Sequence, residues 1–433
     1  MTGNRGLSEA DRAALLKRLA GRSTTAAPEV APSTARDFST LPAAREVAAT
    51  RALGRQVGLS NPYFRPHEGI AGARTVIGNA EYVNFSSYNY LGLNGDPRVA
   101  EAARQAIARH GVSASASRFV SGERPVHGAL EAALAANYGA EDAVVMVSGH
   151  ATNVSVIGHL LGPEDLVVHD ALVHNSATEG VRLSRARRLA FPNNDWEAAA
   201  ALLAAERPRH GRALVLIEGH YSMDGTVPEL ARFAEIARRH DAWLMVDEAH
   251  SLGVLGPTGR GVFESQGVAP GLVDIWMGTL SKTLSACGGY IAGSRTLVDL
   301  LRHTAPGFVY SVGMAPPLAA AAECALRLMQ AEPWRVARLH ANARRFRDKA
   351  RAAGFDTGGS VGQAIVPVIL GESVATARAA ERLFELGVNV QPIVFPVVPE
   401  GQARLRFFLS CEHSEEDIDN TIRTLSRVAR EAA

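Results

Sequence analysis

Two apolar runs in the middle of the chain constrain the fold most strongly. ALVLIEG covers residues 213–219, and AWLMVDE covers residues 242–248. Such runs are typical of strands that are buried on both faces in a mainly parallel sheet. The residues between them, PELARFAEIARRH at 228–240, have the apolar spacing of a helix. The chain therefore belongs to the α/β class, with helices covering both faces of a central sheet.

The same alternation extends on both sides of these runs. Expected helices cover 97–110, 150–161 and 228–240, and expected strands cover 142–147, 165–168, 213–218, 243–247 and 273–278. After Pro316 and Pro317 the chain turns to long helices rich in Ala and Arg. Short strands are then expected at 364–369 and 404–409. This change of pattern predicts a smaller C-terminal α+β domain.

The N-terminal residues have a different character. Residues 7–20 have the pattern of a short amphipathic helix, and residues 21–40 are rich in Ala, Pro, Ser and Thr, as in a mobile linker. The domain organisation that we expect is a flexible extension at 1–45, an N-terminal segment at 46–95, a large domain at 96–315 and a small domain at 316–433.

Composition excludes several classes of function. The net charge is +1, with 47% hydrophobic and 21% charged residues, so no nucleic-acid footprint and no polybasic membrane patch is expected. No apolar run reaches the roughly 18 residues of a membrane-spanning helix, and the first residues lack the core of a signal peptide. We expect a cytoplasmic protein. The cysteines, Cys287, Cys324 and Cys411, have no CxxC spacing, which predicts neither a metal site nor a disulfide framework.

Lysine is rare in this chain, which uses arginine for nearly all of its 45 basic residues. The three lysines are Lys17, Lys282 and Lys349. Lys282 is the only charged residue in IWMGTLSKTLSACGGYIAGS, residues 275–294. A desolvated lysine can lose its proton and form a Schiff base with a carbonyl, which arginine cannot do. A lysine that caps a loop or pairs with an acid is the structural alternative.

Other polar residues follow the expected strands, at the edge where ligands bind in open α/β sheets. Ser148 and Gly149 open a helix, whose free amides suit an anion. Asp247 ends the run WLMVDEAH and needs a partner once it is buried. A protonated ring nitrogen is one candidate partner. A helix cap or a structural salt bridge is the alternative.

Seven segments occur in the order and spacing of a known family. They are SSYNYLGL, SGHATN, HDALVHNS, EGHYSMDG, VDEAHSLGVLG, GTLSKTLSACGGY and VVPEGQARLRFFLS, within residues 60–425. This series resembles the α-oxoamine synthases, which are pyridoxal phosphate (PLP) enzymes of fold type I. The resemblance implies a homodimer that joins an amino acid to an acyl thioester with loss of carbon dioxide.

The resemblance also implies roles for individual catalytic residues. Lys282 would form the Schiff base with PLP and move the proton on the amino acid's Cα, and Asp247 would pair with the pyridine nitrogen. His174 would stack on the ring. His250 and Ser222 would bond the phenolic oxygen. His220, in the same EGHYSMDG segment as Ser222, has no assigned role.

Further positions would bind the phosphate and the substrate. Backbone amides at Ser148, Gly149 and His150 and the Thr279 hydroxyl lie where the family holds the phosphate. Ser311 is the one serine or threonine in the loop, residues 310–313, that often contacts the partner subunit's phosphate. Arg406 would bind the substrate carboxylate, with Arg404 as the alternative. Tyr88 stands where several members have asparagine, which suggests a different contact to that carboxylate.

Alternatives to this function remain open from the sequence. The same cofactor serves aminotransferases and CoA-dependent lyases, and the fold could serve as a scaffold without chemistry. The acyl group could arrive on CoA or on a carrier protein, because the N-terminal leader is similar to docking segments of assembly-line enzymes. The sequence does not specify the amino acid or the acyl chain.

Overall fold

The computed structural model describes residues 36–432 of the 433-residue chain. The predicted helix at 7–20 and most of the predicted linker at 21–40 lie outside these residues. Chain contacts divide the protein into two units, one ending at Gly58 and one beginning at Leu59. The described part of the first unit holds the 3-10 helix η1 (Phe38–Thr40) and the helix α2 (Pro42–Gln56). Proline suits the first position of α2, because the amide that it lacks would have no partner there.

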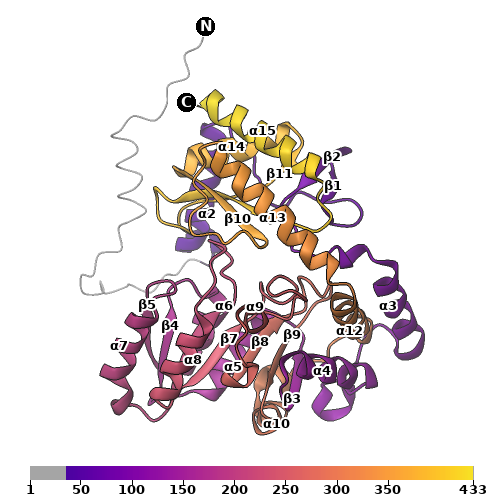
Figure 1. Ribbon diagram of the computed structural model, residues 1–433, viewed down its shortest axis with the longest axis vertical. Coiled ribbons are helices and arrows are strands. Elements are labelled where there is room, and N and C mark those ends of the chain that lie inside the picture. The colour runs from indigo at the N-terminus through magenta and orange to yellow at the C-terminus, as the bar shows by residue number, and fades with distance from the viewer. Residues whose placement is uncertain (1–35, 433) are drawn as a thin grey trace. The chain divides into compact units, whose positions relative to one another are not determined.

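A seven-stranded sheet organises the second unit (Figure 1), in the order β3-β9-β8-β7-β6-β4-β5. The strands are β3 (Asp142–Met146), β4 (Leu166–Asp170), β5 (Arg187–Phe191), β6 (Ala213–Glu218), β7 (Trp243–Asp247), β8 (Ile275–Thr279) and β9 (Gly289–Gly293). Of these seven, β9 alone runs in the direction opposite to the other six. The mainly parallel sheet expected from the apolar runs is confirmed.

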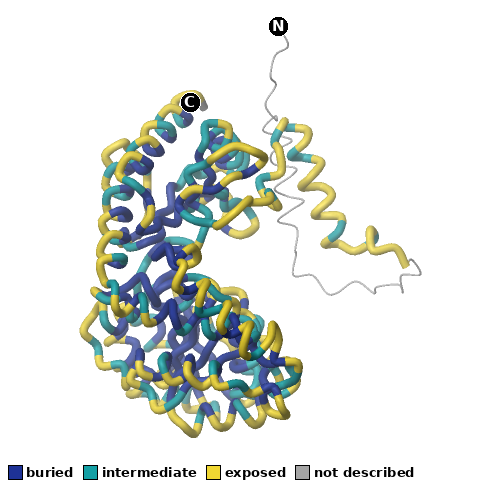
Figure 2. Tube along the Cα trace, turned by 90° about the vertical axis from the view of Figure 1, so that its right-hand side faces the viewer, coloured by how far each residue is buried: buried dark blue, intermediate teal, exposed yellow. Residues whose placement is uncertain are grey.

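Successive residues of the central strands enter opposite cores, as the two-residue period of a strand requires. On β6, Val215 and Ile217 belong to one hydrophobic cluster, while Leu214 and Leu216 belong to the other. Every residue of β4, β6, β8 and β9 is buried. Figure 2 shows the buried segments of the chain inside a layer of exposed ones. The strands are thus covered on both faces.

Helices lie on each face of the sheet. One cluster takes side chains from α4 (Pro125–Tyr138), α7 (Trp196–Glu206) and α8 (Leu230–Arg239). The other takes them from α5 (Gly149–Leu160), α6 (Asn175–Ser184) and α10 (Arg295–Thr304). The predicted helices on both faces are therefore confirmed. The helices that complete this region are α3 (Pro97–His110), α9 (Val262–Gln266) and α11 (Pro306–Val309).

The C-terminal region forms the expected smaller α+β part. An antiparallel sheet holds β10 (Ile365–Gly371), β13 (Ala403–Phe408) and β12 (Gln391–Ile393). Its helices are α12 (Pro316–Ala331), α13 (Trp334–Ala352), α14 (Ser373–Glu385) and α15 (Glu415–Ala432). Among the described residues, no helix combines the length and the apolar character needed to cross a membrane.

Residues before the large sheet also join this region. β1 (Arg74–Ile77) pairs with β2 (Ala80–Asn84), and β2 pairs in parallel with β11 (Val388–Asn389). Phe408 on β13 donates its amide to the Phe85 carbonyl at 2.9 Å. These bonds hold the segment after β2, which carries Tyr88, beside β13. The division of the chain at residues 96 and 316 stays a prediction.

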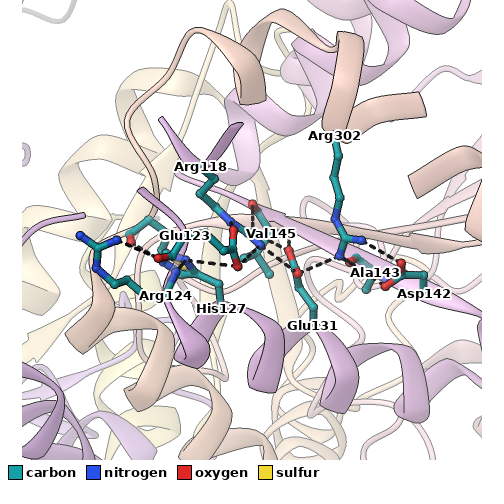
Figure 3. Close-up of polar contacts among 10 residues, drawn as sticks. Arg118, Glu123, Arg124, His127, Glu131, Asp142, Ala143, Val145 and Arg302 are labelled. Carbon is teal, nitrogen blue, oxygen red and sulfur yellow. Dashed lines mark hydrogen bonds and ion pairs between the residues drawn. The ribbon is translucent and has the colours of Figure 1, made fainter. Parts of the chain in front are cut away.

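A buried ion network anchors β3 to its neighbouring helices (Figure 3). Glu131 on α4 bonds Arg118 Nη1 at 2.5 Å and Arg302 Nη2 at 2.8 Å. Glu131 also accepts the Val145 amide of β3, and Arg302 on α10 bonds Asp142 at 2.9 Å. The Arg118 and Glu131 side chains are each 4% exposed, so each charge depends on its partner for stabilisation.

Candidate active site

Lys282 lies beyond the end of β8, at the edge of the sheet where the neighbouring β6 and β7 also end. Its Nζ is 5.6 Å from the centroid of the Tyr88 ring, and it lines a cavity of about 380 Å³ with Tyr88. Desolvation lowers the pKa of Lys282 from 10.5 to about 8, Asp247 and Glu218 oppose this effect, and Arg406 adds to it. The site therefore holds an amine that loses its proton near pH 8, well below the range of an ordinary lysine.

Asp247 ends β7 and is buried, as expected for an acid that binds a specific partner. Its Oδ2 accepts a hydrogen bond from Asn153 Nδ2 at 2.9 Å, and its Oδ1 accepts one from the Ala249 amide at 2.9 Å. A carboxylate has about four acceptor positions, so two bonds leave capacity for a protonated ring nitrogen. Sequence reasoning missed Asn153 as a partner, although it belongs to the SGHATN segment.

Glu218 is a second buried acid beside Asp247, and the two are paired residues on β6 and β7. Burial, and then the charge of Asp247, raise the pKa of Glu218 well above its usual value. Its Oε1 accepts the backbone amide of His174 at 2.6 Å. Glu218 thus holds the main chain of His174 in place, a contact that the sequence did not reveal.

His174 is the N-cap residue of α6, and its ring is exposed. Its Nδ1 lies 2.8 Å from Ser176 Oγ, and its ring centroid lies 6.3 Å from that of His150. Desolvation lowers the pKa of His174, and Lys282 adds to the effect. An accessible imidazole whose charged form is disfavoured can stack on a planar ligand.

His250 is buried and lies parallel to Phe408, with ring centroids 6.1 Å apart. The Tyr90 hydroxyl is 2.7 Å from its Nδ1. Burial lowers the pKa of His250 far below 6.5, and the charges of Lys282 and Arg406 lower it further. Tyr90, which sequence reasoning also missed, leaves the other ring nitrogen of His250 for a ligand.

At the predicted phosphate position, the backbone of Gly149 lies close to the side chain of Thr279. A Cβ added to Gly149 would lie 2.6 Å from Thr279 Oγ1, and one added to Gly289 would lie 2.6 Å from Gly149 Cα. Ser148 caps α5, whose first amides have no carbonyl partner within the helix. Only glycine therefore lets the start of α5, with its free amides, approach the Thr279 hydroxyl this closely, and both can then face one anion.

Arg406 and Arg404 have different partners. Arg404 pairs with Asp224, whereas Arg406 donates to the Ser222 carbonyl at 3.2 Å. The Nε of Arg406 is buried and has no hydrogen-bond partner among the described residues. The Arg406 guanidinium also lies 4.6 Å from the Phe408 ring, against which Tyr88 packs. The geometry favours Arg406 over Arg404 for a carboxylate ligand.

The side chains of His220 and Ser311 form their hydrogen bonds with residues other than those described above. His220 is fully buried, its Nδ1 bonds the Thr226 carbonyl at 3.2 Å, and burial lowers its pKa to about 4. Ser311 bonds the Val312 carbonyl of its own loop at 3.3 Å. Neither forms a hydrogen bond to the predicted catalytic residues within the described part of the chain. The cross-subunit role of Ser311 stays a prediction.

These residues fit PLP on four observations of the structure. The first three are a lysine that can lose its proton, an acid with free acceptor positions, and a glycine that lets free amides approach Thr279, all at one edge of the sheet. The fourth is the arginine nitrogen without a partner on β13. They match the aldehyde, the pyridine nitrogen, the phosphate and the substrate carboxylate of a PLP enzyme in turn.

Comparisons with known proteins agree with this fit. The family model "Aminotransferase class I and II" matches residues 80–425. The 8-amino-7-oxononanoate synthase of Geobacter sulfurreducens is 40% identical over 89% of this chain and 98% of its own length. That of Anaeromyxobacter sp. strain K is 44% identical over 81% of this chain and 87% of its own length.

Solved structures show the same relationship. The serine palmitoyltransferase of Sphingomonas wittichii has a TM-score of 0.86 and 29% identity, covering 92% of this chain and 99% of its own. A serine palmitoyltransferase solved with PLP has the same TM-score and coverage and 28% identity. The chain therefore belongs to the class I and II aminotransferase family, and within it to the PLP-dependent acyltransferases called α-oxoamine synthases.

Proposed function

We propose that this enzyme joins an α-amino acid to an acyl thioester, releases carbon dioxide and the thiol, and yields an α-amino ketone. The observation that carries the proposal is the pair formed by Lys282, whose pKa is about 8, and the buried Asp247. PLP, when bound, supplies a cationic conjugated ring that accepts the electron pair left at the Cα of the amino acid.

Lys282 has two tasks in this proposal. Its amine would hold the cofactor through the aldehyde before the amino acid arrives, and the same amine would then move the Cα proton of the amino acid. Both tasks need an unprotonated Nζ. With a pKa of about 8, a useful fraction of the Lys282 amine is unprotonated near neutral pH. Asp247 would pair with the ring nitrogen of the cofactor, and His174 would lie against one face of the ring.

Arg406 orients the amino acid in this account. Its guanidinium has a free Nε, and a charge-assisted bond to the substrate carboxylate would satisfy that buried group. The Tyr88 hydroxyl contacts the same guanidinium and helps to hold it. The carbon–carbon bond then forms between the amino acid's Cα and the thioester carbonyl carbon, and the carboxylate leaves as carbon dioxide.

Product analysis tests this reaction against its rivals. The purified enzyme would be supplied with a carboxyl-labelled amino acid and an acyl thioester. Release of labelled carbon dioxide together with free thiol and an amino ketone is the expected result. A keto acid without carbon dioxide would identify an aminotransferase, and cleavage of an amino ketone by free CoA without condensation would identify a lyase. No product and no bound cofactor would favour a scaffold.

The amino donor can be identified by spectroscopy. We expect a few small amino acids among the twenty to change the visible absorption of the PLP-loaded enzyme at low concentration. An absence of response to all twenty would argue against the proposed substrate class. The acyl chain would then be tested with thioesters of increasing length, on CoA and on a carrier protein.

We infer a homodimer from an exposed apolar surface. Phe119, Val120 and Tyr310 are 53%, 77% and 85% exposed. The Gly313 amide bonds the Ala116 carbonyl at 2.8 Å, so the two loops that carry these side chains lie together. Such a surface supports burial against a second copy. Sedimentation should give a dimer, and Val120→Asp should weaken it.

Two expectations from the sequence stay predictions. One is the cytoplasmic location. The other is recognition of a carrier protein by the N-terminal leader, which lies outside the described residues. Removing residues 1–40 should slow turnover of a carrier-bound thioester and leave turnover of the CoA thioester unchanged. If the shortened protein turned over the carrier-bound thioester as fast as the full-length protein does, docking by the leader would be excluded.

A further inference from the structure

A chain of hydrogen bonds connects two of the proposed catalytic groups, Asp247 and His174. Asn153 Nδ2 is 2.9 Å from Asp247 Oδ2 and 3.0 Å from Ser176 Oγ. Ser176 Oγ is in turn 2.8 Å from His174 Nδ1. Asn153 and Ser176 are each only 1% exposed, so water does not compete for these bonds.

Asp247, at one end of this series of hydrogen bonds, determines which atom is the donor in each of them. The carboxylate of Asp247 can only accept, so the amide atom of Asn153 that faces it is the nitrogen. The second N–H of that nitrogen then donates to Ser176 Oγ. The hydroxyl of Ser176 is left with its own hydrogen to donate, and His174 Nδ1 is the atom within reach.

A second donor reaches the same ring nitrogen. The backbone N–H of Ser176 lies 3.2 Å from His174 Nδ1, which is the N-cap bond of α6. A proton on Nδ1 would lose this bond as well as the bond from the Ser176 hydroxyl, so each of the two donors favours an unprotonated Nδ1. The positive end of the α6 dipole further disfavours a charged imidazole at this position.

We propose that Asn153 and Ser176 are positioning residues that keep His174 as the neutral imidazole with its proton on Nε2. The Nε2 of His174 has no hydrogen bond within the described residues, so its N–H is an available donor beside Lys282. This inference rests on the proposed function only in taking His174 as the residue that faces the cofactor ring. The opposite tautomer would present a lone pair on Nε2 in place of this donor.

The charged groups around His174 come from several elements. Asp247 on β7 favours the charged imidazole, whereas Lys282 after β8, His150 on α5 and Arg406 on β13 disfavour it. Glu218 bonds the backbone amide of His174 and not its ring. The hydrogen-bond chain through Asn153 therefore decides which nitrogen carries the single proton.

Nitrogen NMR of the cofactor-free protein, labelled with ¹⁵N-histidine, tests the proposal directly. The spectrum of His174→Phe identifies the His174 signals by their loss. In the wild type we expect a protonated Nε2 and an unprotonated Nδ1. Removing the hydroxyl in Ser176→Ala should shift the tautomer ratio about fivefold toward protonated Nδ1. Asn153→Leu should shift it in the same direction, and Ser176→Thr should restore the wild-type ratio.

Two results would overturn the proposal. One is a wild-type His174 with its proton on Nδ1. The other is a wild-type ratio in both Ser176→Ala and Asn153→Leu, with melting curves that show both variants folded. Should either variant fail to fold, the other variant and the wild-type spectrum still decide. Because neither cofactor nor substrate is present, failure of the wild type to release carbon dioxide would contradict the proposed function without changing this result.

Discussion

Arg404 and Arg406 lie two residues apart on β13 and on the same side of the strand, yet they have different partners. Arg404 is paired with Asp224, while Arg406 keeps a buried Nε without a partner in the described residues. The turn that contains Ser222 and Asp224 thus separates a structural arginine from one that can bind a ligand. This distinction leads to the first prediction.

Arg406→Ala should lower kcat/KM for the amino acid by about 10- to 100-fold, because a hydrogen bond to a charged group is worth about 1.5–3 kcal/mol. Steady-state kinetics measures the change, which should appear mainly as a higher KM. Arg406→Lys should recover part of the loss, since it keeps the charge but not the fork. Arg404→Ala should lower the melting temperature instead. The reverse pattern would reassign the carboxylate site to Arg404.

Gly149→Ala should weaken PLP binding by about 10- to 100-fold. The new Cβ would lie 2.6 Å from Thr279 Oγ1, and such overpacking costs about 1–3 kcal/mol. Equilibrium dialysis of PLP measures the affinity. Gly128→Ala on α4 is the matched control, because its Cβ would meet no atom within 4 Å. That control should bind PLP normally and gain about 0.5–1 kcal/mol of stability. Equal affinity in both variants would remove Gly149 from the phosphate site.

The acylation of Lys282 in the cofactor-free protein should increase with pH around a midpoint near pH 8, because only the neutral amine reacts. Mass spectrometry of the peptide that contains Lys282 measures this reaction separately from the other lysines. Asp247→Asn should move the midpoint to lower pH, since the charge of Asp247 raises the pKa of Lys282. A midpoint near 10.5 in both proteins would contradict the account of the site.

The same pKa links stability to pH. The folded pKa of Lys282 lies below its unfolded value, so the unfolded chain binds more protons between about pH 8 and 10.5. The contribution of this group to stability therefore rises with pH across that window. Lys282→Met should stabilise the cofactor-free protein most below pH 8, and this advantage should shrink as the pH rises. Thermal melts at several pH values measure the difference.

Glu131→Ala should destabilise the protein by about 3–5 kcal/mol, because it leaves the buried guanidinium of Arg118 and the partly buried guanidinium of Arg302 without their shared partner. Urea unfolding followed by circular dichroism measures the loss. The exposed pair of Glu101 and Arg104 provides the control, and Glu101→Ala should unfold close to the wild type. Equal midpoints for the two variants would show that the network in Figure 3 contributes nothing.

Some strands were predictable from the sequence and others were not, for a physical reason. β6 and β7 are continuous apolar runs because both of their faces are buried. β5, with the sequence RRLAF, is an edge strand whose exposed arginines hide the pattern. β9, with the sequence GYIAG, begins and ends in glycine, a residue that weakens strands because it has no side chain to pack. Gly289 is needed there because it contacts Gly149, a contact that sequence spacing does not encode.

The site shows the same limit. Lys282 and Asp247 were predictable because one follows a strand and the other ends one, and both strand ends are visible in the sequence. The bonds from Asn153 to Asp247 and Ser176, and the bond from Tyr90 to His250, join residues far apart in the chain. Their geometry depends on how α5, α6 and the segment after β2 pack, which no local pattern specifies.

Reduction of the PLP-loaded enzyme with borohydride, followed by peptide mass spectrometry, tests the central claim most directly. The chain has only three lysines, so the modified position can be assigned without ambiguity. The account predicts a reduced pyridoxyl group on Lys282 alone, and none on Lys282→Ala. Attachment to Lys17 or Lys349, or no attachment in a protein that binds PLP, would contradict it.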